Sequence, residues 1–251
     1  LRRDVNSQFG SKDTKRLTAS YRPNNSLTLR GAFSTGFRAP VPSETSSAYP
    51  DPLYPYFGNP ALEPEDSRSV EVGVDYQIGD ATRLSATLFR TGIENLVQFD
   101  ACRVTIDLVN FSCDPGKFST VINDEGTSTY KGLELSLQHR FSDRVGVSLA
   151  YTRLDAKTST GAAVPRVAEH ELNLAFEANL FKRLNGELSI THVAGRPNST
   201  SPAQPMPDYT VVDLGLEYSM TESAVAYIKA HNLFDEQYQQ VAGYGTSGRC
   251  V

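Results

Sequence analysis

Strict alternation of apolar and polar residues, in two adjoining runs, is the feature that most constrains how this chain of 251 residues can fold. In the first run, residues 133–141, leucines at positions 133, 135 and 137 alternate with polar side chains. The second run, residues 145–152, follows a polar turn and alternates in the same way. Successive side chains of a β-strand point to opposite faces, so the pattern predicts a β-hairpin with one apolar and one polar face.

The connections between such runs alternate between short and long along the chain. Short turns are expected at 23–26, 79–82, 142–144, 182–185 and 219–223, and long connections at 37–66, 99–128, 158–167, 197–207 and 234–248. Short turns join antiparallel neighbours. If the strands run up and down, every short turn lies at one end and every long loop at the other, which is typical of outer-membrane barrels.

The polar face carries ionisable side chains that a dry core would not accommodate. They are Arg30, Glu71, Asp75, Glu134, Glu171, Glu177, Glu187, Asp213 and Glu217. A soluble sandwich would cover the apolar face with a second sheet or a helix, whereas a membrane barrel turns it to lipid and keeps a polar lumen. We therefore expect the apolar side chains of 133–141 to face lipid and the polar ones to face water.

An aromatic residue precedes every short turn. These residues are Tyr21, Tyr76, Phe141, Phe181 and Tyr218. All but Phe181 share the phase of the apolar face. Aromatic rings at one height on the outward face are typical of an interfacial girdle.

The fold class predicted is all-β, an antiparallel up-and-down transmembrane β-barrel with about ten long strands. The expected strands are 15–22, 27–36, 67–78, 83–98, 129–141, 145–157, 168–180, 186–196, 208–218 and 224–233, with possible further strand stubs at both ends of the chain. No apolar run reaches the 18 residues of a transmembrane helix. The net charge of −5, without a basic stripe, argues against a nucleic-acid partner.

Three cysteines bear on the compartment. Cys102 and Cys113 bracket a short segment of the second long loop, where a local disulfide would imply an oxidising environment. Two free thiols are the alternative. Cys250 has no evident partner. No cysteine or histidine pair has metal-ligand spacing, so the cysteines are not expected to bind a metal, and no cofactor is expected. The second long loop also carries clustered carboxylates that could coordinate Ca²⁺, but without EF-hand spacing a solvated acidic loop is favoured; they are Asp100, Asp107, Asp114, Asp124 and Glu125.

Catalytic motifs are missing from the sequence. The four histidines fall on four different expected strands, and no nucleophile-elbow or phosphate-loop motif occurs. The chain is therefore not expected to be an enzyme. An outer-membrane hydrolase built around His170 is kept as a weak alternative.

Several segments together resemble the TonB-dependent outer-membrane receptors, which import ferric siderophores, haem and vitamin B12. The matching stretches include "SLTLRGAFSTGFRAP", "GNPALEPEDSRSVEVGVDY", "YKGLELSLQHRF" and "KAHNLFDEQYQQVAGY". The resemblance implies that the chain is one part of a barrel that has about 22 strands when complete. Residues 1–251 would be the C-terminal portion of that barrel domain, with the plug domain and the final strand absent.

The resemblance also implies a function and a location. The chain would act in the bacterial cell outer membrane, in uptake of a scarce nutrient, a ferric siderophore or vitamin B12. Its partners would be outer-membrane lipid, the metal-chelate or cobalamin ligand and, through the plug, the inner-membrane TonB energy-coupling complex. A passive porin or an adhesin on the same barrel is the alternative.

Receptors of this kind often hold a ligand with loop aromatics and arginines. The corresponding candidates here are Tyr49, Tyr54, Tyr56, Phe57, Arg103 and Tyr244. The prolines between the first four limit the entropy lost when that loop is ordered. A loop that packs on itself would use the same rings, and the sequence leaves both readings open.

Overall fold

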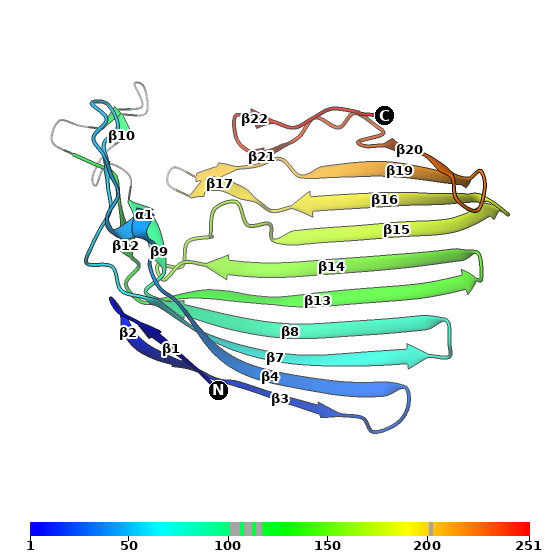
Figure 1. Ribbon diagram of the computed structural model, residues 1–251, viewed down its shortest axis with the longest axis horizontal. Coiled ribbons are helices and arrows are strands. Elements are labelled where there is room, and N and C mark those ends of the chain that lie inside the picture. Colours follow the sequence, from blue (N-terminus) through cyan, green and yellow to red (C-terminus); the bar gives the residue numbers. More distant parts are fainter. Residues whose placement is uncertain (101–105, 108–111, 114–116, 201–202) are drawn as a thin grey trace.

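A ten-stranded antiparallel sheet dominates the computed structural model, which describes residues 1–100, 106–107, 112–113, 117–200 and 203–251. The strands are β3 (Arg16–Tyr21), β4 (Leu27–Arg38), β7 (Glu65–Ile78), β8 (Thr82–Glu94), β13 (Thr127–Ser142), β14 (Val145–Lys157), β15 (His170–Phe181), β16 (Leu184–Ala194), β19 (Tyr209–Ser219) and β20 (Val225–Ala230). Consecutive strands of this set are neighbours throughout, with β3 and β20 at the two edges (Figure 1). The prediction of an all-β, up-and-down antiparallel fold is confirmed.

The two kinds of connection separate as predicted. Tight turns join β3 to β4, β7 to β8, β13 to β14, β15 to β16 and β19 to β20 at one end of the sheet, on the right of Figure 1. The long connections gather at the other end. We call these the turn end and the loop end.

The strand register divides the side chains into two faces, because directly paired residues lie on the same side of a sheet. One row of paired residues across six strands contains Leu29, Val74, Ala86, Leu135, Tyr151 and Leu172. On the opposite face, the Arg30 Nε lies 2.7 Å from Asp75 Oδ2, and Ser85 donates to Asp75 at 2.8 Å. One face is thus apolar and the other a polar network that water can reach.

No dry core lies beneath the apolar rows of the described residues. Val70, Val72 and Leu88 are 52%, 54% and 56% exposed. The single helix that the structure describes, α1 (Pro42–Thr45), lies in a loop and covers neither face. No helix among the described residues is long and apolar enough to span a bilayer. The exposure of valine and leucine rows agrees with a face that meets lipid.

The five aromatic residues of the expected girdle lie at the turn end and are exposed. Phe141 packs edge-on against His139, with ring centroids 4.5 Å apart, so the two rings share a face. Phe181 departs from simple alternation because the pairing register shifts between Asn179 and Phe181. An irregularity of this kind redirects the side chain that follows it, which sequence periodicity alone did not anticipate.

Smaller hairpins form at the loop end. They comprise β1 (Arg2–Asn6) with β2 (Gly10–Thr14), β5 (Ala48–Tyr49) with β6 (Tyr56–Phe57), β9 (Val97–Asp100) with β12 (Thr120–Asn123), β10 (Ile106–Asp107) with β11 (Ser112–Cys113), β17 (Pro197–Thr200) with β18 (Ala203–Pro205), and β21 (Gln239–Val241) with β22 (Tyr244–Gly245). The N-terminal stub is therefore one arm of a hairpin. Its partner arm is tied to the main sheet by Lys12 Nζ, 2.6 Å from Asp66 Oδ2.

Candidate functional site

The candidate site is the cluster of loops above β4, β7 and β8. The connection from β4 to β7 carries α1 and the β5–β6 hairpin, and the connection from β8 to β13 carries β9 and β12. Figure 1 shows α1, β9 and β12 gathered at the loop end of the sheet. Four of the six candidate ligand residues belong to the first connection, so its structure decides what they can do.

The backbone of Ser119 fastens the β5–β6 hairpin to the second connection. Its amide donates to the carbonyl of Pro55 at 2.8 Å, and its carbonyl accepts from the amide of Phe57 at 3.0 Å. Ser119 is completely buried. Because a buried backbone group that loses its partner costs free energy, these two bonds hold the two loops together.

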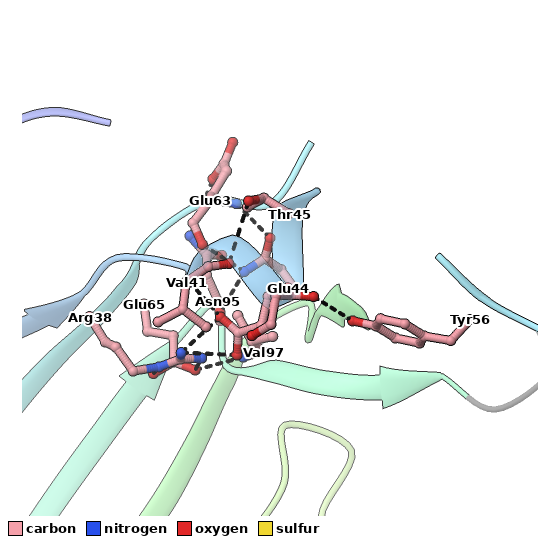
Figure 2. A network of polar contacts seen from close by, with 11 residues as sticks. Arg38, Val41, Glu44, Thr45, Tyr56, Glu63, Glu65, Asn95 and Val97 are labelled. Carbon is pink, nitrogen blue, oxygen red and sulfur yellow. Dashed lines mark hydrogen bonds and ion pairs between the residues drawn. The ribbon is translucent and has the colours of Figure 1, made fainter. Parts of the chain in front are cut away.

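A charged clasp holds the first connection to the strand ends (Figure 2). The guanidinium of Arg38 donates to Glu65 from Nε at 2.8 Å and from Nη2 at 2.7 Å, and to both oxygens of Glu44 at 3.0 Å from Nη1. Glu65 also accepts from the amide of Val97, at 2.9 Å. Arg38 comes from the "GFRAP" stretch and ends β4, while Glu65 begins β7, so the clasp joins both strands to α1 and to β9.

The clasp lies beyond the apolar band, and its charges reinforce one another. Arg38 and Glu65 pair at the ends of β4 and β7, one step beyond the row of Phe37 and Asp66, in which Lys12 already forms an ion pair with Asp66. Burial raises the pKa of Glu65, but the hydrogen bonds from Arg38 and Val97 and the charge of Arg38 together lower it below its ordinary value. The hydrogen bonds that Arg38 donates, chiefly to Glu65 and then to Glu44, raise the pKa of Arg38 against the opposing effect of burial. Both groups are held in their charged forms.

A second set of polar contacts joins the two connections through asparagine. Asn123 Oδ1 accepts from the amide of Glu63 at 2.8 Å, while its Nδ2 donates to the carbonyls of Glu63 and Asn95 at 3.0 and 2.7 Å. Asn59, from the "GNP" stretch, donates to the carbonyl of Val121 at 3.0 Å. Residues about sixty positions apart are thereby fixed side by side, which no local pattern predicts.

The candidate rings of the first connection divide into packed and exposed ones. Tyr56 is half-buried: its hydroxyl donates to the carbonyl of Ser43 at 3.1 Å, and its ring stacks on Phe99 with centroids 6.3 Å apart. Burial, followed by the charge of Glu44, raises its pKa. Phe57 packs edge-on against Phe118 at 5.4 Å and is 38% exposed. Tyr54 is half-buried.

Tyr49 differs from the others because it is 64% exposed while its backbone pairs with Tyr56. Leu53, at the tip of the same hairpin, is 66% exposed. The hairpin thus presents apolar side chains to solvent. Tyr56 packs the loop, whereas Tyr49 is exposed, and a role of these rings in ligand binding stays a prediction.

The remaining candidates are not part of this cluster. Tyr244 is exposed on β22, in the connection after β20, at the far edge of the sheet from β4 (Figure 1). Arg103 and Cys102 lie outside the described residues, and of Cys113 only the backbone, in β11, is described. The disulfide therefore stays a prediction. Cys250 is a free, exposed thiol.

Near the β20 edge of the sheet, Arg196 packs with two tyrosines in an arrangement that the sequence analysis did not predict. Arg196 is buried and donates to the carbonyls of Gln239 and Gln240 at 2.5 and 2.9 Å. Its guanidinium lies 5.3 Å from the ring centroid of Tyr209, which stacks on Tyr238 at 4.3 Å. An arginine followed by a proline at the end of an expected strand was the only signal. No group of residues suited to a metal ion occurs in the part of the chain that the structure describes.

Comparison with known proteins gives a consistent picture. The family model described as "TonB dependent receptor-like, beta-barrel" matches residues 1–233. The iron-regulated outer membrane virulence protein of Vibrio cholerae is 26% identical over 99% of this chain and 40% of its own length. The vitamin B12 transporter BtuB of the same species is 27% identical over 99% of this chain and 38% of its own.

Solved structures agree on the fold. The ferric enterobactin receptor PfeA of Pseudomonas aeruginosa, in complex with enterobactin, superposes with a TM-score of 0.78 at 18% identity, over 98% of this chain and 40% of that one. The siderophore receptor PirA of Acinetobacter baumannii gives 0.74 at 18% identity, over 97% of this chain and 40% of its own. The chain spans about 40% of these relatives, and its ten-stranded sheet matches part of their barrels.

Proposed function

Because the chain belongs to the TonB-dependent receptor β-barrel family, we propose that residues 1–251 form the C-terminal portion of a receptor barrel that takes up a ferric siderophore or vitamin B12. The plug domain and the final strand lie outside these residues in this proposal. The family consists of outer-membrane transporters, not enzymes. The long loops face the outside of the cell and the short turns face the periplasm.

The observation that carries the proposal is the exposed hairpin tip on a rigid base. Tyr49 and Leu53 present apolar surface at the loop end, while Ser119 and the Arg38 clasp fix the hairpin beneath them. A loop that is already ordered loses little entropy when it binds, which favours affinity. Rings in this position suit a ligand with flat or apolar surfaces, such as a catecholate chelate or a corrin.

Energy coupling completes the proposal. The substrate binds the loops from outside, and the TonB complex of the inner membrane acts on the plug to admit it. The curated relatives support a metal chelate or cobalamin as cargo: one is named as iron-regulated and the other as a vitamin B12 transporter. These relatives, at 26% and 27% identity, support a scarce nutrient as the class of substrate. Uptake experiments decide between a ferric siderophore and vitamin B12.

The test uses the full-length receptor in cells that lack other receptors for the same substrate. Binding of radiolabelled ferric enterobactin and of labelled cyanocobalamin is measured with and without the proton-motive force. We expect one of the two to bind in both conditions and to enter only when the membrane is energised. Entry that persists without energy would indicate a passive pore and contradict the proposal, as would failure of both substrates and of other ferric chelates to bind.

Substitutions test the role of the hairpin. Tyr49→Ala and Leu53→Ser should each weaken binding about 10-fold, since an aromatic or apolar anchor contributes roughly 1–3 kcal/mol at such sites. Tyr227→Ala is the matched control, because Tyr227 is 71% exposed on β20, well away from this hairpin. Unchanged affinity in both hairpin variants, with normal surface display, would show that the loop is a self-packed lid.

A further inference from the structure

The outward, apolar face of the sheet changes character toward the loop end, where a groove opens across β7, β8, β13 and β14. Its volume is about 770 Å³. Its lining includes three cations, Arg90, Lys131 and Arg153, against one carboxylate, Asp155. These four strands lie side by side in Figure 1. The groove is therefore positively charged, although the whole chain has a net charge of −5.

Two adjacent rows of paired residues build the groove. The row nearer the turn end pairs Val72 with Leu88, Leu88 with Leu133 and Leu133 with Arg153. The next row pairs Val70 with Arg90, Arg90 with Lys131 and Lys131 with Asp155. An apolar floor thus gives way, within one step along the strands, to a cationic rim.

The rim contains an unfavourable pair. Arg90 and Lys131 stand directly opposite each other on neighbouring strands, and like charges in that position are destabilising. Lys131 is partly compensated by Asp155, 3.2 Å away, and Arg153 by Glu169 at 3.6 Å. Arg90 is exposed and makes no ion pair with any residue that the structure describes. An anion placed between Arg90 and Lys131 would remove the repulsion.

The chemistry of the two rows specifies the anion. A phosphate offers several acceptor oxygens, which arginine binds bidentately and lysine as a point charge. The neighbouring floor of Val72, Leu88 and Leu133 suits a hydrocarbon chain. Basic side chains beside an apolar, membrane-facing surface attract anionic lipid headgroups through their charge. The acyl chain of the lipid adds binding free energy because it is buried against the apolar surface.

We propose that this groove binds an anionic, phosphate-bearing lipid of the outer leaflet, with the phosphate between Arg90 and Lys131 and an acyl chain along Val72, Leu88 and Leu133. Arg153 lies at the end of the floor and adds a third positive charge. The inference rests on the proposed orientation, in which the loop end faces outward, and is independent of which substrate the receptor carries. The bound lipid relieves a repulsion built into the sheet.

The test measures lipid binding to the full-length receptor in zwitterionic detergent by native mass spectrometry. The probes are diphosphoryl lipid A, a phosphatidylcholine and inorganic phosphate. We expect lipid A to remain bound, phosphatidylcholine to bind at least 10-fold more weakly, and inorganic phosphate at millimolar concentration not to displace lipid A. Equal binding of phosphatidylcholine would refute the need for negative charge, and displacement by inorganic phosphate would reduce the groove to a simple anion site.

Variants separate binding from folding. Arg90→Gln should weaken lipid A binding at least 10-fold, and Arg90→Lys should restore part of it. Lys182→Gln, a change in a turn at the opposite end of the strands, should have no effect. Because Arg90→Gln removes the repulsion with Lys131, its melting temperature without lipid should equal or exceed that of the parent protein, whereas lipid A should no longer raise it.

Two results with the Arg90→Gln variant would also overturn the inference. One is unchanged lipid A binding by Arg90→Gln. The other is a lower melting temperature of Arg90→Gln without lipid, which would mean that Arg90 stabilises the sheet itself. Binding of the nutrient substrate by this variant should stay normal, so that a failure of the lipid proposal is distinguishable from a failure of the proposed uptake function.

Discussion

Glu65 accepts both parallel hydrogen bonds of the Arg38 guanidinium, from Nε at 2.8 Å and from Nη2 at 2.7 Å. The same carboxylate accepts from the amide of Val97 at 2.9 Å, while Arg38 also reaches Glu44. One ion pair at the ends of β4 and β7 therefore connects the barrel strands to both long loops of the candidate site. We therefore expect the order of both loops to depend on this pair.

Removal of the guanidinium should loosen both loops. Arg38→Gln leaves Glu65, whose side chain is 12% exposed, without its charged partner. Hydrogen bonds to charged groups contribute about 1.5–3 kcal/mol, so amide hydrogen exchange in segments 41–46 and 97–100 should accelerate at least 10-fold. Mass-spectrometric hydrogen exchange on the full receptor measures this.

The matched control is Arg83→Gln, which removes a single 3.3 Å hydrogen bond to Gln77 at the turn end. That variant should leave exchange in both segments unchanged. Equal exchange in Arg38→Gln and the parent protein would mean that Ser119 and Asn123 hold the loops without the clasp.

Acid should open the same clasp. The pKa of Glu65 is lowered in the folded protein, so the folded state favours the carboxylate more than the unfolded chain does. The stability that this gives is fully present above the ordinary glutamate pKa of about 4.3 and is lost as pH falls through the lower folded value. Exchange at Val97, corrected for its intrinsic pH dependence, should therefore rise as pH falls below the ordinary glutamate pKa of about 4.3. Glu65→Gln should abolish that step; a step that persists in this variant would belong to another carboxylate.

Glycine at position 132 is required by the packing of the sheet. A Cβ there would meet the backbone carbonyl of Arg153 and, at 2.8 Å, the ring of Phe89. Gly132→Ala should destabilise the barrel by about 1–3 kcal/mol, as overpacking does, and lower the unfolding temperature seen by heat-modified gel mobility. Gly146→Ala is the control, because its nearest contact would be an ordinary 3.7 Å. Adding Phe89→Ala should not restore the stability of Gly132→Ala, because the clash with the carbonyl of Arg153 remains. Full restoration would mean that the ring of Phe89 is the only group that clashes.

The strands were predictable because their signal is local. Alternation fixes which side chains share a face, and a short turn fixes the neighbour, so β14 has the same bounds, residues 145–157, in the sequence analysis and in the structure. The expected strand 83–98 shows where this fails. It ends at Glu94 in the structure, and β9 begins at Val97 after Asn95, which has a φ of 58°. A left-handed residue ends the pleat although the residues around it still look strand-like.

The site was less predictable because it depends on contacts between distant residues. Tyr49 and Tyr56 look equivalent in the sequence, yet Tyr56 packs on Phe99 and Tyr49 does not. The difference is made by Ser119, which pairs with the Tyr56 side of the hairpin from another loop. Residue type and spacing identify the loop that carries aromatic side chains. Which of those side chains is exposed is decided by contacts with residues that are distant in the sequence.

Arg196 holds β21 in the connection that follows β20. Arg196 donates to the carbonyls of Gln239 and Gln240 and lies over the ring of Tyr209. Lysine is a point donor and does not reproduce two bonds from a planar fork. Arg196→Lys should therefore accelerate hydrogen exchange across segment 236–245 by about 10-fold, and Arg196→Ala by more, because the loss of each hydrogen bond costs roughly 1 kcal/mol or more. Tyr209→Phe, which keeps the ring, should change little. Protection in Arg196→Lys equal to that of the parent protein would mean that the stack of Tyr209 on Tyr238, rather than the arginine fork, anchors this loop.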